Sequence, residues 1–384
     1  MEEFRYVSYA QKVIFAPGSL AGLNEALERF GPRRYLLCAN HSLQAAGHVD
    51  AVRSALGERL VLVFDHVEPH VPDVQFNEIL VRAADKEIDA VIGMGGGSPI
   101  GMAKALAAAL NKNQADEWRP GVSRGDGSIT QLIAIPTTYA GSEMTAVYGI
   151  THTAENPPRK VTVSDPNIAP ALVIYDPELT LDLPKEMTAA TGINALAHCV
   201  EALYSRTRNP LSTAAATAGA HHVVNALLSC YHDGHDLEAR TELLLGAHLA
   251  GLSLASVSMG LHHGLCHVLG GTANIPHGIA NGIILPHAIR FNADATAAQL
   301  TPVAEALGVP VNRVNPMVVA EALVQKIFHL IGQMQLPQRL RDVGVAESSL
   351  TQLAKLGFQN RTVQNNPKPI TSADQLEKLL REAW

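Results

Sequence analysis

The 384-residue sequence is poor in cysteine and aromatic residues and contains no long apolar run. Its four cysteines are scattered without a Cys-x-x-Cys pair, which argues against a disulfide framework and favours reduced, buried thiols. No stretch approaches the roughly 18 apolar residues of a membrane-spanning helix. The first residues, MEEFRYVSYAQK, lack the apolar segment of a signal peptide, so we expect a cytoplasmic protein.

Positive charge is also scarce. The chain has 29 Lys and Arg against 36 Asp and Glu, a net charge of −7. This balance argues against nucleic acid or an acidic membrane surface as a partner and leaves small molecules as the expected ligands. A length of 384 residues suggests two domains.

The first half of the chain alternates strand-like and helix-like segments. The helix-like segments are 19–31 and 73–88. Short Val-, Ile- and Leu-rich runs that end in turn residues lie at 12–18, 35–40, 60–67, 90–97 and 132–138, with further strands at 159–165 and 171–176. This alternation predicts a Rossmann-like parallel sheet covered by helices.

The pattern of residues changes after a Pro-bounded turn near residue 181. Ala- and Leu-rich helical segments follow at 186–205, 211–230, 236–257, 261–270 and 318–333, with no convincing strand. We therefore expect an α/β domain at 1–181 and an all-α domain at 182–384.

A glycine-rich turn follows the strand at 90–97. Gly95, Gly96 and Gly97 allow close backbone approach, Ser98 is a good N-cap and Pro99 a good first helical residue. Free amides at a helix N-terminus attract anions, so the turn favours a nucleotide diphosphate over an ordinary tight turn. Its spacing matches neither the GxGxxG nor the Walker motif.

A second polar turn ends the strand at 132–138. Thr137, Thr138 and Ser142 offer hydroxyl groups. Ligands of parallel sheets bind at the carboxyl ends of strands, so this turn and the glycine turn are expected to share one ligand. The alternative is an ordinary capped turn.

Histidines are concentrated in the second half. His262, His263, His267 and His277 fall within 16 residues, and His263 and His267 share a helical face. The Gly-Gly pair after them is expected to break the helix and turn His277 back. Their candidate roles are metal ligation, proton transfer and anion binding, against the alternative of satisfied core histidines.

A further polar pair, Asn194 and His198, lies four residues apart on one face of an apolar helix. Asn offers a neutral oxygen, a poorer metal ligand than a carboxylate. The histidines and Asn194 would then form a polar, potentially cationic pocket of imidazoles, although a three-His zinc site remains chemically possible.

The chain resembles the iron-containing alcohol dehydrogenase superfamily over nearly its whole length, and within it the maleylacetate reductases. The stretches that carry this resemblance are GGGS (95–98), PTTYAGSEMT (136–145), RKVTVSD followed by DPELT, GINALAHCVEALYS (192–205), and GLHHGLCHVLGG with PHG (260–278). One loop, PHGIANGIILPH (276–287), is more similar to the alcohol dehydrogenases.

The resemblance implies a nicotinamide dinucleotide, either NADH or NADPH. Gly95, Gly96, Gly97 and Ser98 would hold its pyrophosphate, Thr137, Thr138 and Ser142 would flank the adenine and ribose, Leu179 would contact the adenine, and Lys160 would lie near the nicotinamide ribose. Asn40 stands where an acid often binds the ribose 2′-hydroxyl, so neither cofactor is excluded.

The resemblance also bears on the metal. In metal-dependent members an Asp at position 194 joins His198, His263 and His277 around Fe²⁺ or Zn²⁺, with His267 beside the nicotinamide. Here Asn194 replaces the Asp, as in maleylacetate reductases, and Gly101 replaces another acid. We therefore expect no metal; if one is present, Asn194, His198, His263 and His277 would surround it.

The implied reaction is reduction of the conjugated C=C bond of maleylacetate, a dicarboxylate from aromatic-compound degradation, to 3-oxoadipate. The expected catalytic residues are His198, His263, His267, His277, Asn194 and Tyr139. The family also implies a homodimer. Alternatives are a metal-dependent alcohol dehydrogenase or aldehyde reductase, a dehydroquinate-synthase-like lyase, and a non-catalytic nucleotide-binding protein.

Overall fold

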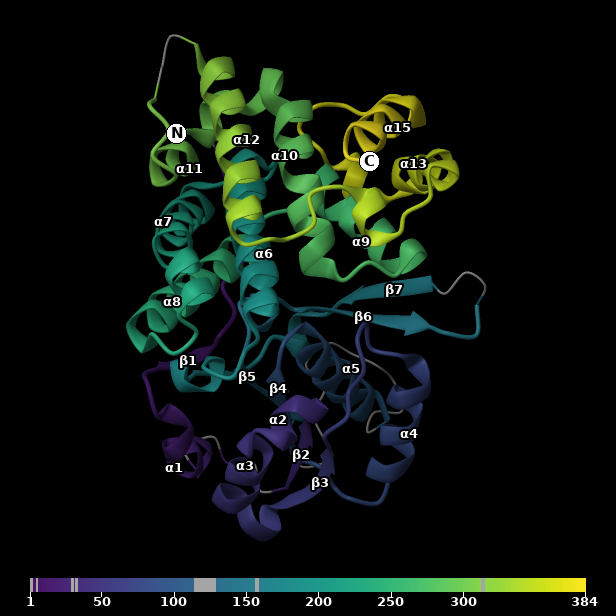
Figure 1. Ribbon diagram of the computed structural model, residues 1–384. Helices are drawn as coiled ribbons and strands as arrows, with labels where there is room; N and C mark the ends of the chain where they lie inside the picture. Colours follow the sequence, from purple (N-terminus) through teal and green to yellow (C-terminus); the bar gives the residue numbers. More distant parts are fainter. Residues whose placement is uncertain are drawn as a thin grey trace. The chain divides into compact units, whose positions relative to one another are not determined.

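The computed structural model describes residues 3–4, 6–28, 31, 34–113, 129–155, 159–311 and 315–384 (Figure 1). They form two compact units. The α/β unit spans Ser8–Thr138 and Ser142–Leu183, and the helical unit spans Met1–Val7, Tyr139–Gly141 and Pro184–Trp384. The last residue of the α/β unit is Leu183, but the chain also changes unit after Val7, after Thr138 and after Gly141, which the single expected boundary near residue 181 does not include. No sequence pattern indicated that Tyr139–Gly141 belongs to the helical unit.

A six-stranded sheet is the centre of the α/β unit, and all of its strand pairs are parallel, as the sequence predicts. The strand order is β1-β8-β5-β4-β2-β3. The bounds are β1 (Lys12–Phe15), β2 (Tyr35–Cys38), β3 (Leu60–Phe64), β4 (Ala90–Gly95), β5 (Gln131–Pro136) and β8 (Leu172–Tyr175). The order reverses between β2 and β4, which is where doubly wound sheets bind their ligands.

Helices supply a core to each face of this sheet. Successive strand residues point to opposite faces, so Leu37 and Ile92 pack in one cluster while Leu36 and Val91 pack in another. The first cluster includes residues of α1 (Leu23–Glu28), α2 (His41–Ala45) and α3 (His48–Leu56), and the second includes residues of α4 (Asp73–Ala83) and α5 (Gly97–Asn113). Burial on both faces explains why β2 and β4 are apolar without alternation.

A separate antiparallel hairpin corrects one prediction. β6 (Val147–His152), which the sequence analysis missed, pairs with β7 (Arg159–Ser164) outside the parallel sheet. The buried ammonium of Lys104 on α5 holds the chain that leads into β6. It donates hydrogen bonds to the carbonyl oxygens of Ser142 (2.6 Å) and Val147 (3.0 Å) and to the Thr145 hydroxyl (3.1 Å).

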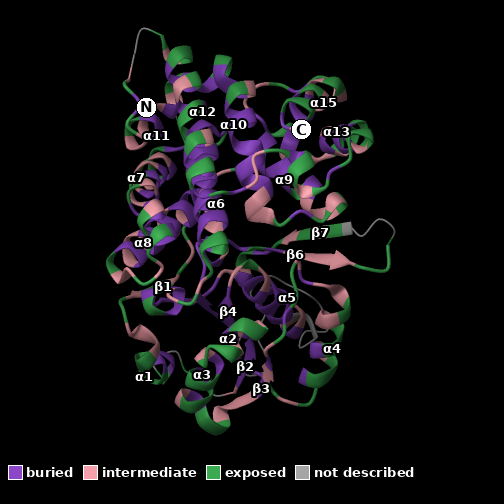
Figure 2. Cartoon of the chain, viewed as in Figure 1, coloured by how far each residue is buried: buried purple, intermediate pink, exposed green. Residues whose placement is uncertain are grey.

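The helical unit is built around α6, most of which is buried (Figure 2). The helices are α6 (Lys185–Tyr204), α7 (Pro210–His232), α8 (Leu237–Ala255), α9 (Leu261–Ala273), α10 (His277–Thr296), α11 (Thr301–Ala306), α12 (Pro316–Gln333), α13 (Leu350–Gln359), α14 (Arg361–Gln364) and α15 (Ala373–Glu382). The segments predicted from the sequence do not include α10, which contains Pro286, α11, or the helices after α12. Within the described residues, no helix has the length and apolar character needed to cross a membrane.

Candidate functional site

The two polar turns meet at one edge of the sheet, since β4 and β5 are parallel neighbours. The amide of Thr137 donates to the carbonyl oxygen of Gly95 at 3.1 Å. A Cβ placed on Gly96 would lie 3.1 Å from the side chain of Thr138. The structure therefore brings together the two turns that the sequence analysis assigned to one ligand.

The start of α5 differs in detail from the prediction. The helix begins at Gly97, so Ser98 lies in its first turn instead of capping it, and its hydroxyl accepts a hydrogen bond from the amide of His70 at 3.1 Å. Of the three turn glycines, only Gly95 has a positive φ, 137°. A Cβ on Gly97 would meet nothing within 4 Å. The helix N-terminus thus faces open space, as a cradle for an anionic ligand requires.

The other predicted cofactor residues differ in their surroundings. Thr137 and Thr138 are buried, and the buried Oγ of Ser142, in η3 (Ser142–Met144), has no hydrogen-bond partner. Leu179, in η5 (Pro177–Thr180), is part of the hydrophobic core, which accounts for it without a ligand.

Asn40 and Lys160 complete the predicted cofactor set. Asn40 follows Ala39, the first residue after β2, and accepts a hydrogen bond from the Ser42 hydroxyl at 3.2 Å. Lys160 lies in β7, and its side chain passes over Gly149 of β6, where a Cβ would collide with it. Desolvation lowers the pKa of Lys160.

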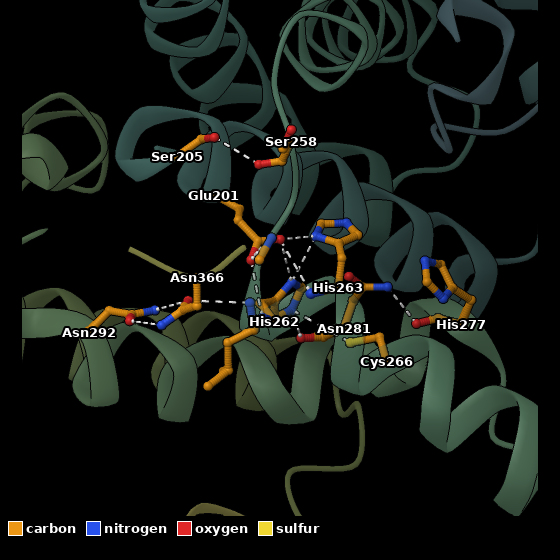
Figure 3. Close-up of polar contacts among 12 residues, drawn as sticks. Glu201, Ser205, Ser258, His262, His263, Cys266, His277, Asn281, Asn292 and Asn366 are labelled. Carbon is orange, nitrogen blue, oxygen red and sulfur yellow. Dashed lines mark hydrogen bonds and ion pairs between the residues drawn. The ribbon is translucent and has the colours of Figure 1, made fainter. Parts of the chain in front are cut away.

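In the helical unit, α6 presents three polar groups to one site. Asn194, His198 and Glu201 are four and three residues apart on one face of α6, and all are buried. The sequence analysis missed Glu201. Its carboxylate accepts hydrogen bonds from the backbone amides of Gly260 (3.0 Å), His262 (3.1 Å) and His263 (3.3 Å), at the N-terminus of α9 (Figure 3).

The hydrogen bonds around Glu201 determine which ring nitrogens carry protons. The carbonyl oxygen of Asn281 can only accept, so Nε2 of His262, 3.1 Å away, donates to it. Nδ1 of His263 lies 2.5 Å from the Glu201 carboxylate and donates to it. Neutral His262 then has an unprotonated Nδ1, which lies 3.1 Å from Nδ1 of His263. Neutral His263 therefore carries a lone pair on Nε2.

Among the described residues, Oδ1 of Asn194, Nδ1 of His198 and Nε2 of His263 are buried without a hydrogen-bond partner. The rings of His198 and His263 are stacked, with centroids 4.7 Å apart. The Nδ2 group of Asn194 donates to the carbonyl oxygen of Ala140 at 3.3 Å. Unpaired buried polar atoms are costly, so their concentration here is typical of a ligand site.

The other two histidines extend the same group. The His277 ring lies 6.1 Å from that of His263 and is stacked on His267 at 5.5 Å, between centroids. The predicted Gly-Gly break is wrong. The helix α9 continues to Ala273 and ends at Asn274, whose φ is 51°, and α10 then begins at His277. Asn tolerates this left-handed conformation better than most residues.

Burial sets the charge of the central histidines. Desolvation, reinforced by neighbouring imidazoles, holds the pKa of His198 and of His263 well below the ordinary range. Both rings are therefore neutral near pH 7, whereas the sequence left open a potentially cationic pocket. The sequence pattern showed which imidazoles are present but not how far they are removed from water.

The donor set leaves a transition metal no free carboxylate. Among the described residues, one group of three His, Cys, Asp or Glu side chains has its candidate ligand atoms within 4.8 Å of one another. It consists of Glu201, His262 and His263. The Glu201 carboxylate is already saturated by N–H donors. A metal beside Asn194 would meet only an amide oxygen and imidazoles, with no anionic ligand.

Tyr139, the remaining predicted catalytic residue, is fully buried in the helical unit. Its hydroxyl accepts a hydrogen bond from Arg240 at 2.9 Å. Neither the Arg240 contact nor the Glu201 network was found from the sequence. One signal for Glu201 was available, because a single acid on the apolar face that carries Asn194 and His198 needs a partner.

Known proteins are similar to this chain over its full length. Residues 10–177 match the iron-containing alcohol dehydrogenase family, and residues 188–384 match the C-terminal region of the Fe-containing alcohol dehydrogenase family. A maleylacetate reductase from Burkholderia cepacia is 34% identical over 384 residues, covering 100% of this chain and 98% of that protein.

Two solved structures share the fold. A maleylacetate reductase from Agrobacterium tumefaciens is 32% identical with a TM-score of 0.85, covering 100% of this chain and 99% of that one. An iron-containing alcohol dehydrogenase from Corynebacterium glutamicum is 32% identical with a TM-score of 0.83, covering 100% and 97%. With both of its parts matched, this chain belongs to the iron-containing alcohol dehydrogenase family and is an oxidoreductase.

Proposed function

We propose that the chain uses NADH or NADPH, without a metal ion, to reduce the conjugated C=C bond of maleylacetate to 3-oxoadipate. The observation that carries this proposal is the hydrogen bond from Nδ2 of Asn194 to the Ala140 carbonyl oxygen, 3.3 Å. A carboxylate at position 194 could only accept hydrogen bonds, so its oxygen would face the Ala140 carbonyl oxygen, another acceptor, without a proton between them. Full-length relatives that bear the name maleylacetate reductase support the choice of substrate.

The reaction needs one hydride and one proton. The reduced cofactor, which Gly95, Gly96, Gly97 and Ser98 would hold, would supply the hydride to the alkene carbon β to the ketone. The substrate would then be an enolate, and one proton on its α carbon would give 3-oxoadipate. The protein must bind two carboxylates, stabilise the enolate oxygen and supply that proton.

His263 and Glu201 are suited to the proton step. A dianion beside His263 favours a proton on Nε2, because opposite charge stabilises the imidazolium. The Glu201 carboxylate, 2.5 Å from Nδ1, balances that charge. The Nε2–H group then donates to the enolate and transfers its proton. His198, His277 and the uncharged Asn194 complete the wall of the site in this proposal, with His267 beside the nicotinamide.

A metal-dependent alcohol dehydrogenase is the second candidate. It is favoured by the unpaired atoms Oδ1 of Asn194, Nδ1 of His198 and Nε2 of His263, which a cation would satisfy. In that case these residues and His277 would hold an ion that polarises a substrate oxygen. Oxidation of NADH and of NADPH with maleylacetate and with a panel of aldehydes, with and without chelator, separates the two functions.

The first test replaces Asn194 with Asp. The wild type should reduce maleylacetate at the same rate with and without EDTA. In metal-free buffer, Asn194→Asp should slow the reaction by raising its activation free energy by about 1–3 kcal/mol. The reason is that it leaves a buried carboxylate facing both the Ala140 carbonyl oxygen and the dianionic substrate. The same variant should gain Zn²⁺ or Fe²⁺, measured as metal per chain, whereas Asn194→Ala should not. Stoichiometric metal in an EDTA-sensitive wild type would contradict the proposal.

The second test concerns the glycine turn. The Cβ of Gly97→Val would enter open space at the N-terminus of α5, whereas a Cβ at Gly96 would lie 3.1 Å from the Thr138 side chain. NADH affinity, measured by fluorescence titration, should fall at least tenfold, about 1.4 kcal/mol. Gly22→Val, which also enters open space in the same unit, is the control and should leave affinity unchanged. Equal affinities for both variants would exclude this turn as the pyrophosphate site.

The third test concerns the proton donor. Glu201→Gln keeps the shape of the side chain but cannot balance an imidazolium. The turnover of maleylacetate should fall by roughly 10²–10⁴-fold, the usual contribution of general acid catalysis. NADH affinity should stay within about twofold. Thermal unfolding shows whether the variant is folded. A folded variant with normal turnover would remove Glu201 and His263 from the proton step.

A further inference from the structure

The segment Tyr139–Gly141 is held by two helices of its unit, α6 and α8. The amide of Tyr139 donates to the hydroxyl of Thr191 on α6 at 3.4 Å, and Ala140 accepts from Asn194 on the same helix. Gly141 has a φ of 73°, and a Cβ there would lie 3.1 Å from the backbone of Gly251 on α8. Only glycine fits both that conformation and that approach.

A buried arginine fixes the first residue of this segment. Arg240 on α8 is 0% exposed. Its Nη1 group donates to the Tyr139 hydroxyl at 2.9 Å and to the Thr188 hydroxyl at 2.8 Å, and its Nε donates to the Gly234 carbonyl oxygen at 2.9 Å. A buried guanidinium is costly to leave unsatisfied, so these contacts tie the Tyr139 ring firmly to α8 and α6.

We infer that Arg240 and Tyr139 are positioning residues for Asn194. Arg240 holds the Tyr139 hydroxyl, Tyr139 fixes the peptide that follows it, and the Ala140 carbonyl oxygen engages one N–H of Asn194. The amide is thereby kept in one orientation, with Oδ1 left to the ligand. Tyr139 acts through Ala140 and not on the substrate. This inference rests on the proposed role of Asn194 in the site.

Thr188 provides the matched control, because it also accepts from Arg240 Nη1 but lies outside the segment. Tyr139→Phe and Thr188→Val each remove one acceptor of the same buried guanidinium. A purely structural role predicts equal effects on activity. A positioning role predicts that only Tyr139→Phe disturbs Asn194.

The experiment is a double-mutant cycle on kcat, using whichever substrate of the maleylacetate and aldehyde panel the wild type reduces best. Tyr139→Phe should lower kcat about tenfold, leave the KM for NADH within about twofold, and lose its effect in the Asn194→Ala background. Thr188→Val should change kcat less than about twofold. Arg240→Lys should change kcat and KM in the same way as Tyr139→Phe. It replaces Tyr139→Phe in the cycle if Tyr139→Phe does not fold.

Three results would overturn the inference: an unchanged kcat in Tyr139→Phe, an equal loss in the wild-type and Asn194→Ala backgrounds, or an equal loss in Thr188→Val. A wild type that reduces only aldehydes would refute the proposed substrate. The cycle would still run on those aldehydes, so the two failures are distinguishable.

Discussion

The fully buried carboxylate of Glu201 is the constraint on which the site in the helical unit depends. A carboxylate in the interior is tolerated only when hydrogen bonds replace its water. Here the first amides of α9 and the ring of His263 do so. The carboxylate also lies at the positive end of the α9 dipole, which stabilises its charge. One interaction thus joins α6 to α9 and fixes the proton on His263.

The consequences of this interaction explain the pattern of polar atoms around it. With its Nδ1–H committed to Glu201, His263 presents a lone pair to the same region as the unpaired atoms of Asn194 and His198. All three side chains are neutral, because burial suppresses the imidazolium form. The Asn194 amide and its Ala140 partner suit this uncharged wall.

Local patterns predicted the features that the nearby sequence decides by itself. The apolar runs predicted the parallel strands, and the glycine turn was correctly placed between β4 and α5. Asn194 and His198 were correctly assigned to one helical face, since their spacing decides it. Fold class and family follow from these elements together with the resemblance.

The remaining features depend on contacts between distant residues. The Glu201 carboxylate is hydrogen-bonded to Gly260, which lies 59 positions away in the sequence. The Tyr139 hydroxyl is hydrogen-bonded to Arg240, which lies 101 positions away. The strand β6 was not predicted, because its hydrogen bonds to β7 and not its own residue pattern make it a strand. The charge of the histidines depends on burial, which no spacing encodes.

The most direct measurement of the central claim is ¹⁵N NMR of the protein with labelled histidines, with His263 assigned by comparison with His263→Asn. Near pH 7, in the absence of substrate, the account predicts a neutral His263 ring with the proton on Nδ1 and an unprotonated Nε2. A proton on Nε2, in either the neutral ring or an imidazolium, would contradict it.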